Sequence, residues 1–372
     1  MTLEAVFIKP YSSSFCTEEL TLDRALSNKK NNIETIIIPD VNVLIAMEKL
    51  IYYPNTKESY LKKGILGIMS FMNKCTEQEI PIWWAPYFAL LEMPGKNAYD
   101  CFNNLKKFDS KHFRWEYEEC HIDNSTFNKT QISKEFPLIN NEVEKEFLAH
   151  SFYCLLLINI IERDLSELTP FNKLLAYLNL VEHKIGLLSI REFIIATLIF
   201  SPKSKEDLEF NKLKKDICEN FGFKNRTLNY DHDLSIAMIK KATNGARDLS
   251  YLSICCMLHN NTTEKRDVWL ATGDLKLFAF NKFVYSIGGN GMLGKKAVIN
   301  FPTCKNIFFN RAIVEFSLRT SMRQKLIEQV SNTSITNNMI RSCYEIIDLA
   351  GSKLTTEKIP KYGQVIATPF SI

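Results

Sequence analysis

The segment around residue 40 constrains the fold more than any other part of the sequence. Three isoleucines at 36–38 are closed by Pro39, and Asp40 then leads directly into an apolar stretch at 41–45. β-Branched residues at consecutive positions are typical of a parallel strand that is buried on both faces. A helical pattern follows. Asp40 therefore stands at the carboxyl end of a buried strand, where open α/β sheets bind their ligands.

The bulk composition is that of an ordinary folded protein. Of the 372 residues, 46% are hydrophobic and 24% are charged, which excludes wholesale disorder. The length suits one large domain or two to three smaller ones. The formal net charge of +4 permits an anionic partner but does not require one, because basic and acidic residues nearly balance.

The cysteine and histidine patterns favour a reducing compartment without zinc. The ten cysteines include no Cys-x-x-Cys pair, and residues 1–5 lack the basic start of a signal peptide. We therefore expect reduced thiols and a cytoplasmic protein. The six histidines form no His-Glu-x-x-His motif, which disfavours zinc. The apolar runs at 147–161 and 185–200 are too short or too interrupted to cross a membrane, so we expect no membrane partner.

Strand and helix patterns alternate at both ends of the chain, with a helical block between them. Residues 1–33 look like an N-terminal extension, whereas 99–225 and 303–372 are mainly helical in pattern. Further helices are expected at about 43–75, at 233–241 and at 246–259. Strands are expected at 36–38, 80–85, 268–272, 283–287 and 297–301. This order predicts an α/β fold with a large insertion.

Four acidic residues stand where strands and helices meet. Asp40 and Asp274 end strands, Glu92 lies in the first turns of the helix after the second strand, and Asp248 opens the helix from residue 246. If the strands are parallel and adjacent, the carboxylates meet at one sheet edge and repel one another unless a cation is bound. Such hard oxygen ligands suit Mg²⁺ or Mn²⁺. Each acid also has a purely structural interpretation, as a helix cap, a first-turn acid or a turn residue.

These motifs resemble those of the PIN-domain ribonucleases. The matching segments, in the family's order, are Asp40-Val41-Asn42-Val43-Leu44-Ile45, Leu91-Glu92, Arg247-Asp248 and Thr272-Gly273-Asp274. The resemblance covers 34–98 plus 226–302. The gap between Glu92 and Asp248 is longer than in the family, so the resemblance implies an insertion at 99–225. Glu142, Glu144 and Glu146 stay open as alternatives for the second acid.

The resemblance implies a fold as well as an activity. The fold would be a PIN-like three-layer α/β architecture with a central parallel sheet, a helical insertion at 99–225 and a helical C-terminal extension at 303–372. The activity would be a Mg²⁺- or Mn²⁺-dependent endoribonuclease that leaves 5′-phosphate and 3′-hydroxyl ends, as in microbial toxins and defence nucleases. The other interpretations are an inactive PIN-like RNA-binding or assembly module, and a DNA nuclease. A homo-oligomer or a regulatory protein partner is compatible with each of these interpretations.

The resemblance also implies roles for individual residues. Asp40, Glu92, Asp248 and Asp274 would be the catalytic acids and metal ligands. Asn42 and Thr272 would orient those ligands. The candidate RNA contacts are Arg247, Lys276, Lys295 and Lys296. The last two lie in the glycine-containing segment 289–296, which otherwise reads as a connecting turn.

Overall fold

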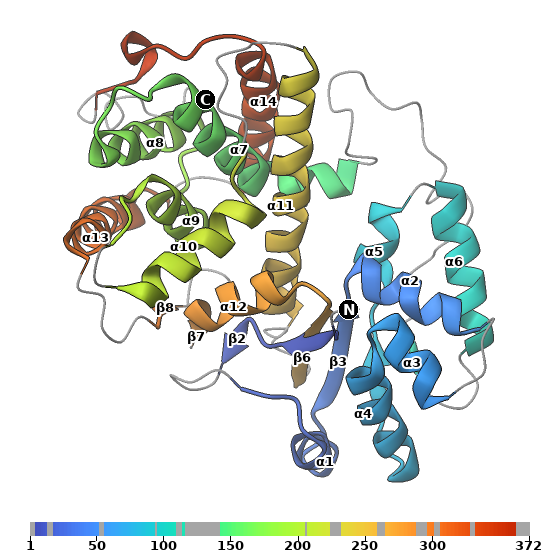
Figure 1. Cartoon of the computed structure of the whole chain (residues 1–372). Coiled ribbons are helices and arrows are strands. Elements are labelled where there is room, and N and C mark those ends of the chain that lie inside the picture. The colour runs from blue at the N-terminus through green and yellow to red at the C-terminus, as the bar shows by residue number, and fades with distance from the viewer. Residues whose placement is uncertain are drawn as a thin grey trace. The chain divides into compact units, whose positions relative to one another are not determined.

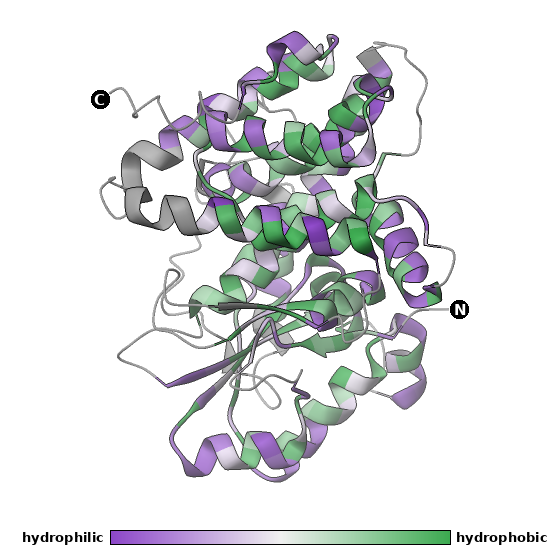
Figure 2. Cartoon of the chain, turned by 90° about the vertical axis from the view of Figure 1, so that its left-hand side faces the viewer, coloured by the Kyte–Doolittle hydropathy of each residue, from purple (hydrophilic) through white to green (hydrophobic). Residues whose placement is uncertain are grey.

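The protein is an α/β protein with two mixed β-sheets (Figure 1). The computed structural model describes residues 4–12, 18–51, 56–93, 95–108, 114–115, 142–204, 207–223, 232–258, 265–287, 296–300, 306–327 and 332–361. Its helices carry hydrophobic and hydrophilic stretches side by side (Figure 2), as helices with one buried face do. Among the helices in these ranges, none combines the length and the apolar character that a bilayer crossing requires.

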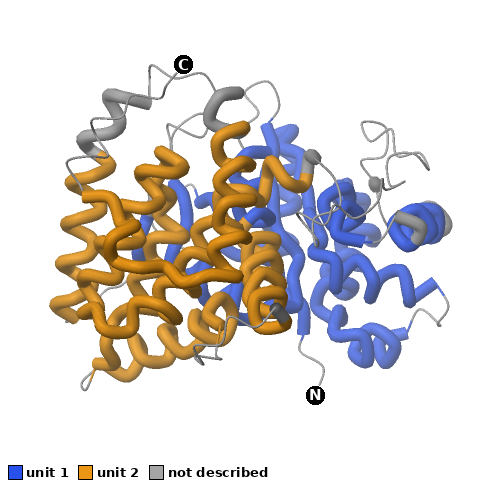
Figure 3. The backbone as a smooth tube through the Cα atoms, turned by 90° about the horizontal axis from the view of Figure 1, so that it is seen from above, with its two compact units in different colours: residues 1–133, 139–141, 250–300 blue, residues 134–138, 142–249, 301–372 orange. Residues whose placement is uncertain are grey.

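The chain divides into two compact units (Figure 3). Unit 1 comprises residues 1–133, 139–141 and 250–300. Unit 2 comprises residues 134–138, 142–249 and 301–372. The helix α11 (His232–Leu258) belongs to both, because the division falls after Leu249.

Unit 1 is built around a five-stranded sheet with the order β1-β6-β3-β4-β5. Its strands are β1 (Val6–Ile8), β3 (Glu34–Pro39), β4 (Ile82–Trp84), β5 (Arg114–Trp115) and β6 (Arg266–Thr272). β3 is parallel to β4 and to β6, and β4 is parallel to β5, whereas β1 is antiparallel to β6. The three strands predicted at 36–38, 80–85 and 268–272 are therefore confirmed as parallel neighbours.

The chain reverses its direction across this sheet between β3 and β6. From β3 it proceeds to β4 and then β5 on one side, and it later returns to place β6 on the other side of β3. In the register of this pair, Pro39 lies opposite Ala271. The carboxyl ends of two strands at such a reversal form the usual ligand-binding position of an open α/β sheet.

Helices pack on the sheet of unit 1 to form its core. They are α1 (Leu22–Lys30), α2 (Val41–Leu50), α3 (Lys57–Lys63), α4 (Leu66–Glu77), α5 (Tyr87–Glu92), α6 (Gly95–Phe108) and α12 (Leu275–Phe283). Ile37, Trp84 and Trp269 of the sheet are fully buried in one cluster with residues of α2, α4, α5 and α6. The helix that follows β3 thus starts directly from the core, with Asp40 at its N-terminus.

A second, smaller sheet also belongs to unit 1. It has the order β2-β7-β8, with β2 at Tyr11–Ser12, β7 at Val284–Ile287 and β8 at Lys296–Ile299. β2 is parallel to β7, and β8 is antiparallel to β7. The strands predicted at 283–287 and 297–301 are confirmed within the described residues.

Unit 2 is helical. Its elements are α7 (Glu142–Asp164), α8 (Pro170–Lys184), α9 (Ile190–Phe200), α10 (Leu208–Asn220), α13 (Ile307–Ile327), α14 (Asn332–Ala350) and the 3₁₀ turn η1 (Thr356–Lys358). The buried helix α7 packs against α8, α9 and α14. At its end, the guanidinium of Arg163 donates to the carbonyls of Ala350 (2.7 Å) and Ser352 (2.8 Å). The chain after α14 is thereby attached to α7.

Several details differ from the sequence-based expectations. The central sheet is mixed and not purely parallel, because residues 6–8, inside the expected N-terminal extension, form the antiparallel strand β1. The single helix expected at 43–75 is three helices, and Gly64 (φ 70°) ends the second of them in the left-handed conformation. The two helices expected at 233–241 and 246–259 are one continuous helix, α11.

Candidate active site at the carboxyl ends of β3 and β6

Asp40 joins β3, α2 and the end of β6. Its Oδ1 accepts a hydrogen bond from the backbone N–H of Val43 at 2.7 Å, so Asp40 is the N-cap of α2. Its Oδ2 accepts from the hydroxyl of Thr272 at 2.5 Å and from the backbone N–H of Gly273 at 3.3 Å. Its own N–H donates to the carbonyl of Ala271 at 2.8 Å. The carboxylate is therefore fixed by groups from both strands.

The Asp40 side chain is nearly enclosed, with the residue only 8% exposed. Burial raises the pKa of this carboxyl, and the hydrogen bonds from Thr272 and from the backbone N–H groups of Val43, Gly273 and Asn42 oppose the shift without cancelling it. Removal from water disfavours the charged form of a carboxyl group. The hydrogen bonds from the protein therefore offset only part of the energetic cost of a charged Asp40 carboxylate.

Asp274 occupies the corresponding position after β6. Its Oδ1 accepts from the backbone N–H groups of Lys276 (2.8 Å) and Leu277 (3.0 Å), so Asp274 is the N-cap of α12. Its own N–H donates to Thr272 Oγ1 at 3.0 Å. Thr272 is fully buried and thus links the two acids, by donating to Asp40 and accepting from the backbone of Asp274.

Glu92 and Asn42 lie on the expected helices, α5 and α2. Glu92 is the last residue of α5, a helix of only six residues that follows β4, so it lies in the first turns of that helix as expected. It is partly exposed, and α5 packs against α2. Asn42 is exposed on the first turn of α2, and its side chain makes no hydrogen bond with any described residue. The expectation that Asn42 orients a ligand is therefore not supported by a contact.

Asp248 and Arg247 belong to unit 2. Asp248 lies in the middle of α11 and does not open a helix as expected, and it is partly exposed. Arg247 forms a two-pronged ion pair with buried Glu144, with both N–O distances 2.8 Å. The guanidinium of Arg247, which was predicted to contact RNA, is thus paired with Glu144. Glu144 was one of the alternatives for the second acid of the candidate site. Glu146 is exposed, and the side chain of Glu142 lies outside the described residues.

The remaining basic candidates are only partly described. Lys276 is half-buried in the first turn of α12, and its backbone N–H donates to Asp274. Lys295 lies outside the described residues. Lys296 begins β8, but its side chain is not described. Their expected contacts with RNA stay predictions.

The fit of a divalent cation depends on the two acids that follow β3 and β6. In the described ranges, no group of three or more His, Cys, Asp or Glu side chains is arranged to hold a metal ion. Mg²⁺ keeps several waters and is commonly bound by one or two carboxylates together with substrate phosphate. Asp40 and Asp274, at the ends of paired strands, fit that mode of binding.

One of the two backbone donors that hold Asp40 was expected from the sequence. The N–H of Val43 binds the carboxylate because Asp40 is a helix cap, which was one interpretation of this residue. The N–H of Gly273 was not expected, because backbone groups leave no residue-type signal. The sequence Thr272-Gly273-Asp274 was its only indication, since a glycine after a strand allows the backbone a close approach.

No protein-family model, no curated protein and no solved structure matches the chain.

Proposed function

We propose that the protein is a divalent-metal-dependent endoribonuclease of the PIN-like type. The proposal rests chiefly on the buried Asp40 carboxylate, held by Thr272 and Gly273 where the strand order of the sheet reverses. Capping alone does not require a charge at this position, because Asn and Ser cap helices as well as Asp. Burial raises the pKa of this carboxyl, and a buried carboxyl group perturbed in this way is a candidate functional group.

In this proposal the residues have distinct roles. Asp40 and Asp274 hold Mg²⁺ or Mn²⁺, and Thr272 keeps the Asp40 carboxylate in place. Glu92 and Asp248 are further proposed acids, the former at the end of α5 and the latter on α11. When bound, the ion supplies an activated water and neutralises charge on the phosphodiester in the transition state.

The test is cleavage of a 5′-labelled single-stranded RNA by the full chain with Mn²⁺, with Mg²⁺ and with EDTA. Asp40→Asn and Asp274→Asn keep the helix caps and remove the charge. We expect each to lower the cleavage rate at least by the roughly 10–100-fold that follows loss of a group supporting a metal ligand. EDTA should abolish cleavage by the wild type.

Asp207 provides a matched control. It is also an N-cap aspartate, and its Oδ1 accepts from the N–H of Phe210 at 2.9 Å at the start of α10. Asp207→Asn makes the same chemical change in the same structural role, so we expect it to leave cleavage unchanged. Equal activity of wild type, Asp40→Asn and Asp274→Asn would refute the proposal.

Two other outcomes of these measurements would assign the protein a different function. RNA binding without cleavage at any metal concentration would identify an inactive RNA-binding module. Faster cleavage of a DNA oligonucleotide of the same sequence would identify a DNA nuclease. Mapping the cleavage sites on total RNA with wild type and Asp40→Asn in parallel would then define the substrate.

A further inference from the structure

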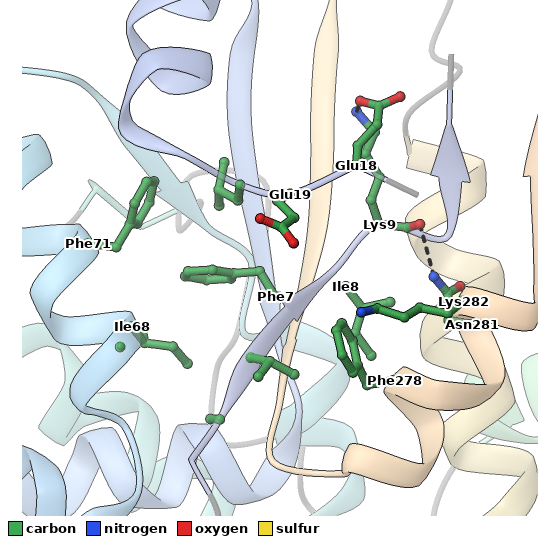
Figure 4. Close-up of a pocket in the computed structure, with 14 residues that line it drawn as sticks. Phe7, Ile8, Lys9, Glu18, Glu19, Ile68, Phe71, Phe278, Asn281 and Lys282 are labelled. Atoms are coloured by element: carbon green, nitrogen blue, oxygen red, sulfur yellow. Dashed lines mark hydrogen bonds and ion pairs between the residues drawn. The ribbon is translucent and has the colours of Figure 1, made fainter. Parts of the chain in front are cut away.

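Unit 1 has a cleft of about 310 Å³ along the outer edge of its main sheet. The strand β1 crosses the cleft, with Ile68 and Phe71 of α4 on one side and Phe278 of α12 on the other (Figure 4). Phe7 packs edge-to-face on Phe71, with the ring centroids 5.3 Å apart. The cleft is therefore an apolar groove whose floor is the edge of a sheet.

The register of β1 against β6 turns the backbone N–H and C=O groups of Phe7 away from the sheet. The carbonyl of Ala271 accepts from Asp40 on the β3 side, so the N–H and C=O groups of Ala271 point away from β1. Its neighbours on β6 consequently point toward β1, where they pair with Val6 and Ile8. Phe7 lies opposite Ala271, and its own N–H and C=O face the cleft. No described residue forms a hydrogen bond with either group.

The two ends of this edge are closed by the protein itself. The N–H of Ala5 donates to the carbonyl of Gly64 at 2.7 Å. The side-chain amide of Asn281 donates to the carbonyl of Lys9 at 3.1 Å (Figure 4). These contacts use the N–H of Ala5 and the C=O of Lys9 and leave Phe7 open between them, which limits uncontrolled pairing between sheets.

Asn281 holds the Lys9 end of the cleft. The residue is 2% exposed and lines the cleft, and its Oδ1 has no hydrogen-bond partner within the part of the chain that is described. A buried acceptor without a donor is unfavourable, and native structures seldom leave one unsatisfied. This oxygen is itself closed to solvent, so the contribution of Asn281 to the cleft is its contact with Lys9.

We infer that this cleft binds an extended peptide segment of a partner protein, which adds a strand to the open edge of β1. The chemistry that recognises it is main-chain hydrogen bonding: one partner residue donates to the C=O of Phe7 and accepts from its N–H. Grooves that combine a strand edge with a helix bind peptides in this way. The inference is independent of nuclease activity.

The groove also specifies the side chains of the peptide. The residue opposite Phe7 shares its face and would pack against Phe71 and Ile68, whereas the next residues would face Ile8 and Phe278. Side chains on both faces of the added strand would meet apolar residues of the cleft. We therefore expect the peptide to carry apolar residues at consecutive positions and not only at alternating ones. Glu19 and Lys282 line the same cleft, and both are exposed. We therefore expect flanking charged residues of both signs.

The probe is a phage-displayed random heptapeptide library, selected against the immobilised full chain. The dominant peptide is then synthesised, and its binding is measured by fluorescence anisotropy. Phe7→Pro removes the outward N–H, and an edge strand tolerates proline where that N–H is unpaired. We expect Phe7→Pro to weaken binding by roughly 5–10-fold or more, as for one or more lost hydrogen bonds.

Phe7→Leu keeps the backbone donor and should weaken binding less than Phe7→Pro. Methylating the peptide amide opposite Phe7 should weaken its binding to the wild type to a similar extent, a measurement that holds even if Phe7→Pro fails to fold. The inference is overturned if the library yields no enriched peptide. It is also overturned if binding is indifferent to both Phe7→Pro and peptide methylation, or if a uridine oligonucleotide displaces the peptide from the cleft.

Discussion

Asp40 combines the role of a helix cap with the burial of a charge. Its Oδ1 holds the first turn of α2 through Val43, whereas its Oδ2 is bound by Thr272 and Gly273. A serine or asparagine would perform the first role without the energetic penalty of a buried charge. A side chain that lowers stability is commonly retained for function. Measurements of stability can therefore separate a structural role of Asp40 from a role in binding a cation.

We predict that Asp40→Asn makes the metal-free protein more stable at neutral pH. The folded-state pKa of Asp40 lies above its unfolded value, so the ionised carboxylate lowers the free energy of unfolding at pH 7. This penalty disappears as the pH falls through the folded-state pKa. Urea unfolding in EDTA should give a higher midpoint for the variant at pH 7, with the difference shrinking toward about pH 4.

Added Mn²⁺ should reverse that order, because a cation that binds only the folded state stabilises it. The wild type should gain stability with Mn²⁺ and Asp40→Asn should gain less. Asp207→Asn serves again as the control with an ordinary cap. Identical midpoints for wild type and Asp40→Asn in EDTA would contradict the argument from burial.

Buried charges also attach the N-terminal segment to the sheet of unit 1. Asp267 of β6 is 2% exposed and accepts from Arg24 Nε at 2.7 Å and from Asn28 Nδ2 at 2.7 Å, and it is paired with Lys9. Burial alone would raise the pKa of Asp267, but Arg24 and Lys9 hold it well below its usual range. These contacts join α1 and the segment after β1 to the strand that leads to Thr272.

We predict that Asp267→Asn destabilises the protein by roughly 3–5 kcal/mol, as expected when one partner of a buried ion pair is removed. Because the folded-state pKa of Asp267 is lowered, its stabilisation is complete above the unfolded pKa of about 4 and is lost as the pH falls below it. Urea midpoints of wild type and variant should therefore differ at pH 7 and converge in acid. A constant difference down to about pH 2 would contradict this assignment.

Gly245 lies inside the continuous helix α11, between the two helices expected from the sequence. A β-carbon at this position would lie 2.8 Å from Phe221 Cδ1 and 2.9 Å from Leu155 Cδ1. The glycine therefore permits close packing of α11 within unit 2 and does not mark the end of a helix. Sequence reasoning could not distinguish the two roles, since a glycine inside a helical pattern is compatible with both.

We predict that Gly245→Ala destabilises the protein by roughly 1–3 kcal/mol through overpacking, although alanine is the better helix former by about 1 kcal/mol. The exposed neighbour Asn244 gives the matched control. Asn244→Ala should be neutral or slightly stabilising in the same urea titration. If Gly245→Ala were as stable as Asn244→Ala, the close approach would be unimportant.

The strands that could be predicted are those with a distinctive side-chain pattern. β3 was predicted from three consecutive isoleucines, and β6 from the apolar run before Thr272. β1 and β5 carry no comparable pattern, whereas β4, which also has three residues, was predicted from its apolar run at 80–85. The strands β1 and β5 exist because an existing sheet edge offers hydrogen-bonding partners. Such a cause is long-range and cannot be predicted from local sequence.

The same distinction between local sequence pattern and long-range packing applies to the residues of the candidate site. The meeting of Asp40 with Thr272 could be predicted, because it requires only that two parallel strands be neighbours. The position of Glu92 on a short helix after β4 could also be predicted, because Pro86 starts that helix and Pro94-Gly95 interrupts the helical pattern. The position of Asp248 could not. It is separated from Glu92 along the sequence by the helices α6 to α10, and the packing of those helices is a long-range property.

The division of the chain into two units predicts that each can lose stability separately. Arg163 is 6% exposed and is paired with Asp164 at 2.7 Å, and its other donors bind the carbonyls of Ala350 and Ser352. Arg163→Met keeps an apolar stem but leaves buried Asp164 without its cation. We therefore expect faster backbone hydrogen exchange in α7 and α14 of unit 2, measured by mass spectrometry on the full chain.

Exchange in β3 and β6 of unit 1 should be unchanged, because contiguous, densely packed regions tend to open as separate cooperative units. Asp267→Asn is the reciprocal variant and should accelerate exchange in β3 and β6 while leaving α7 and α14 protected. If either variant accelerated exchange equally in all four elements, the protein would unfold as a single cooperative unit. The helical unit could then not vary in stability without also altering the stability of the sheet that carries Asp40.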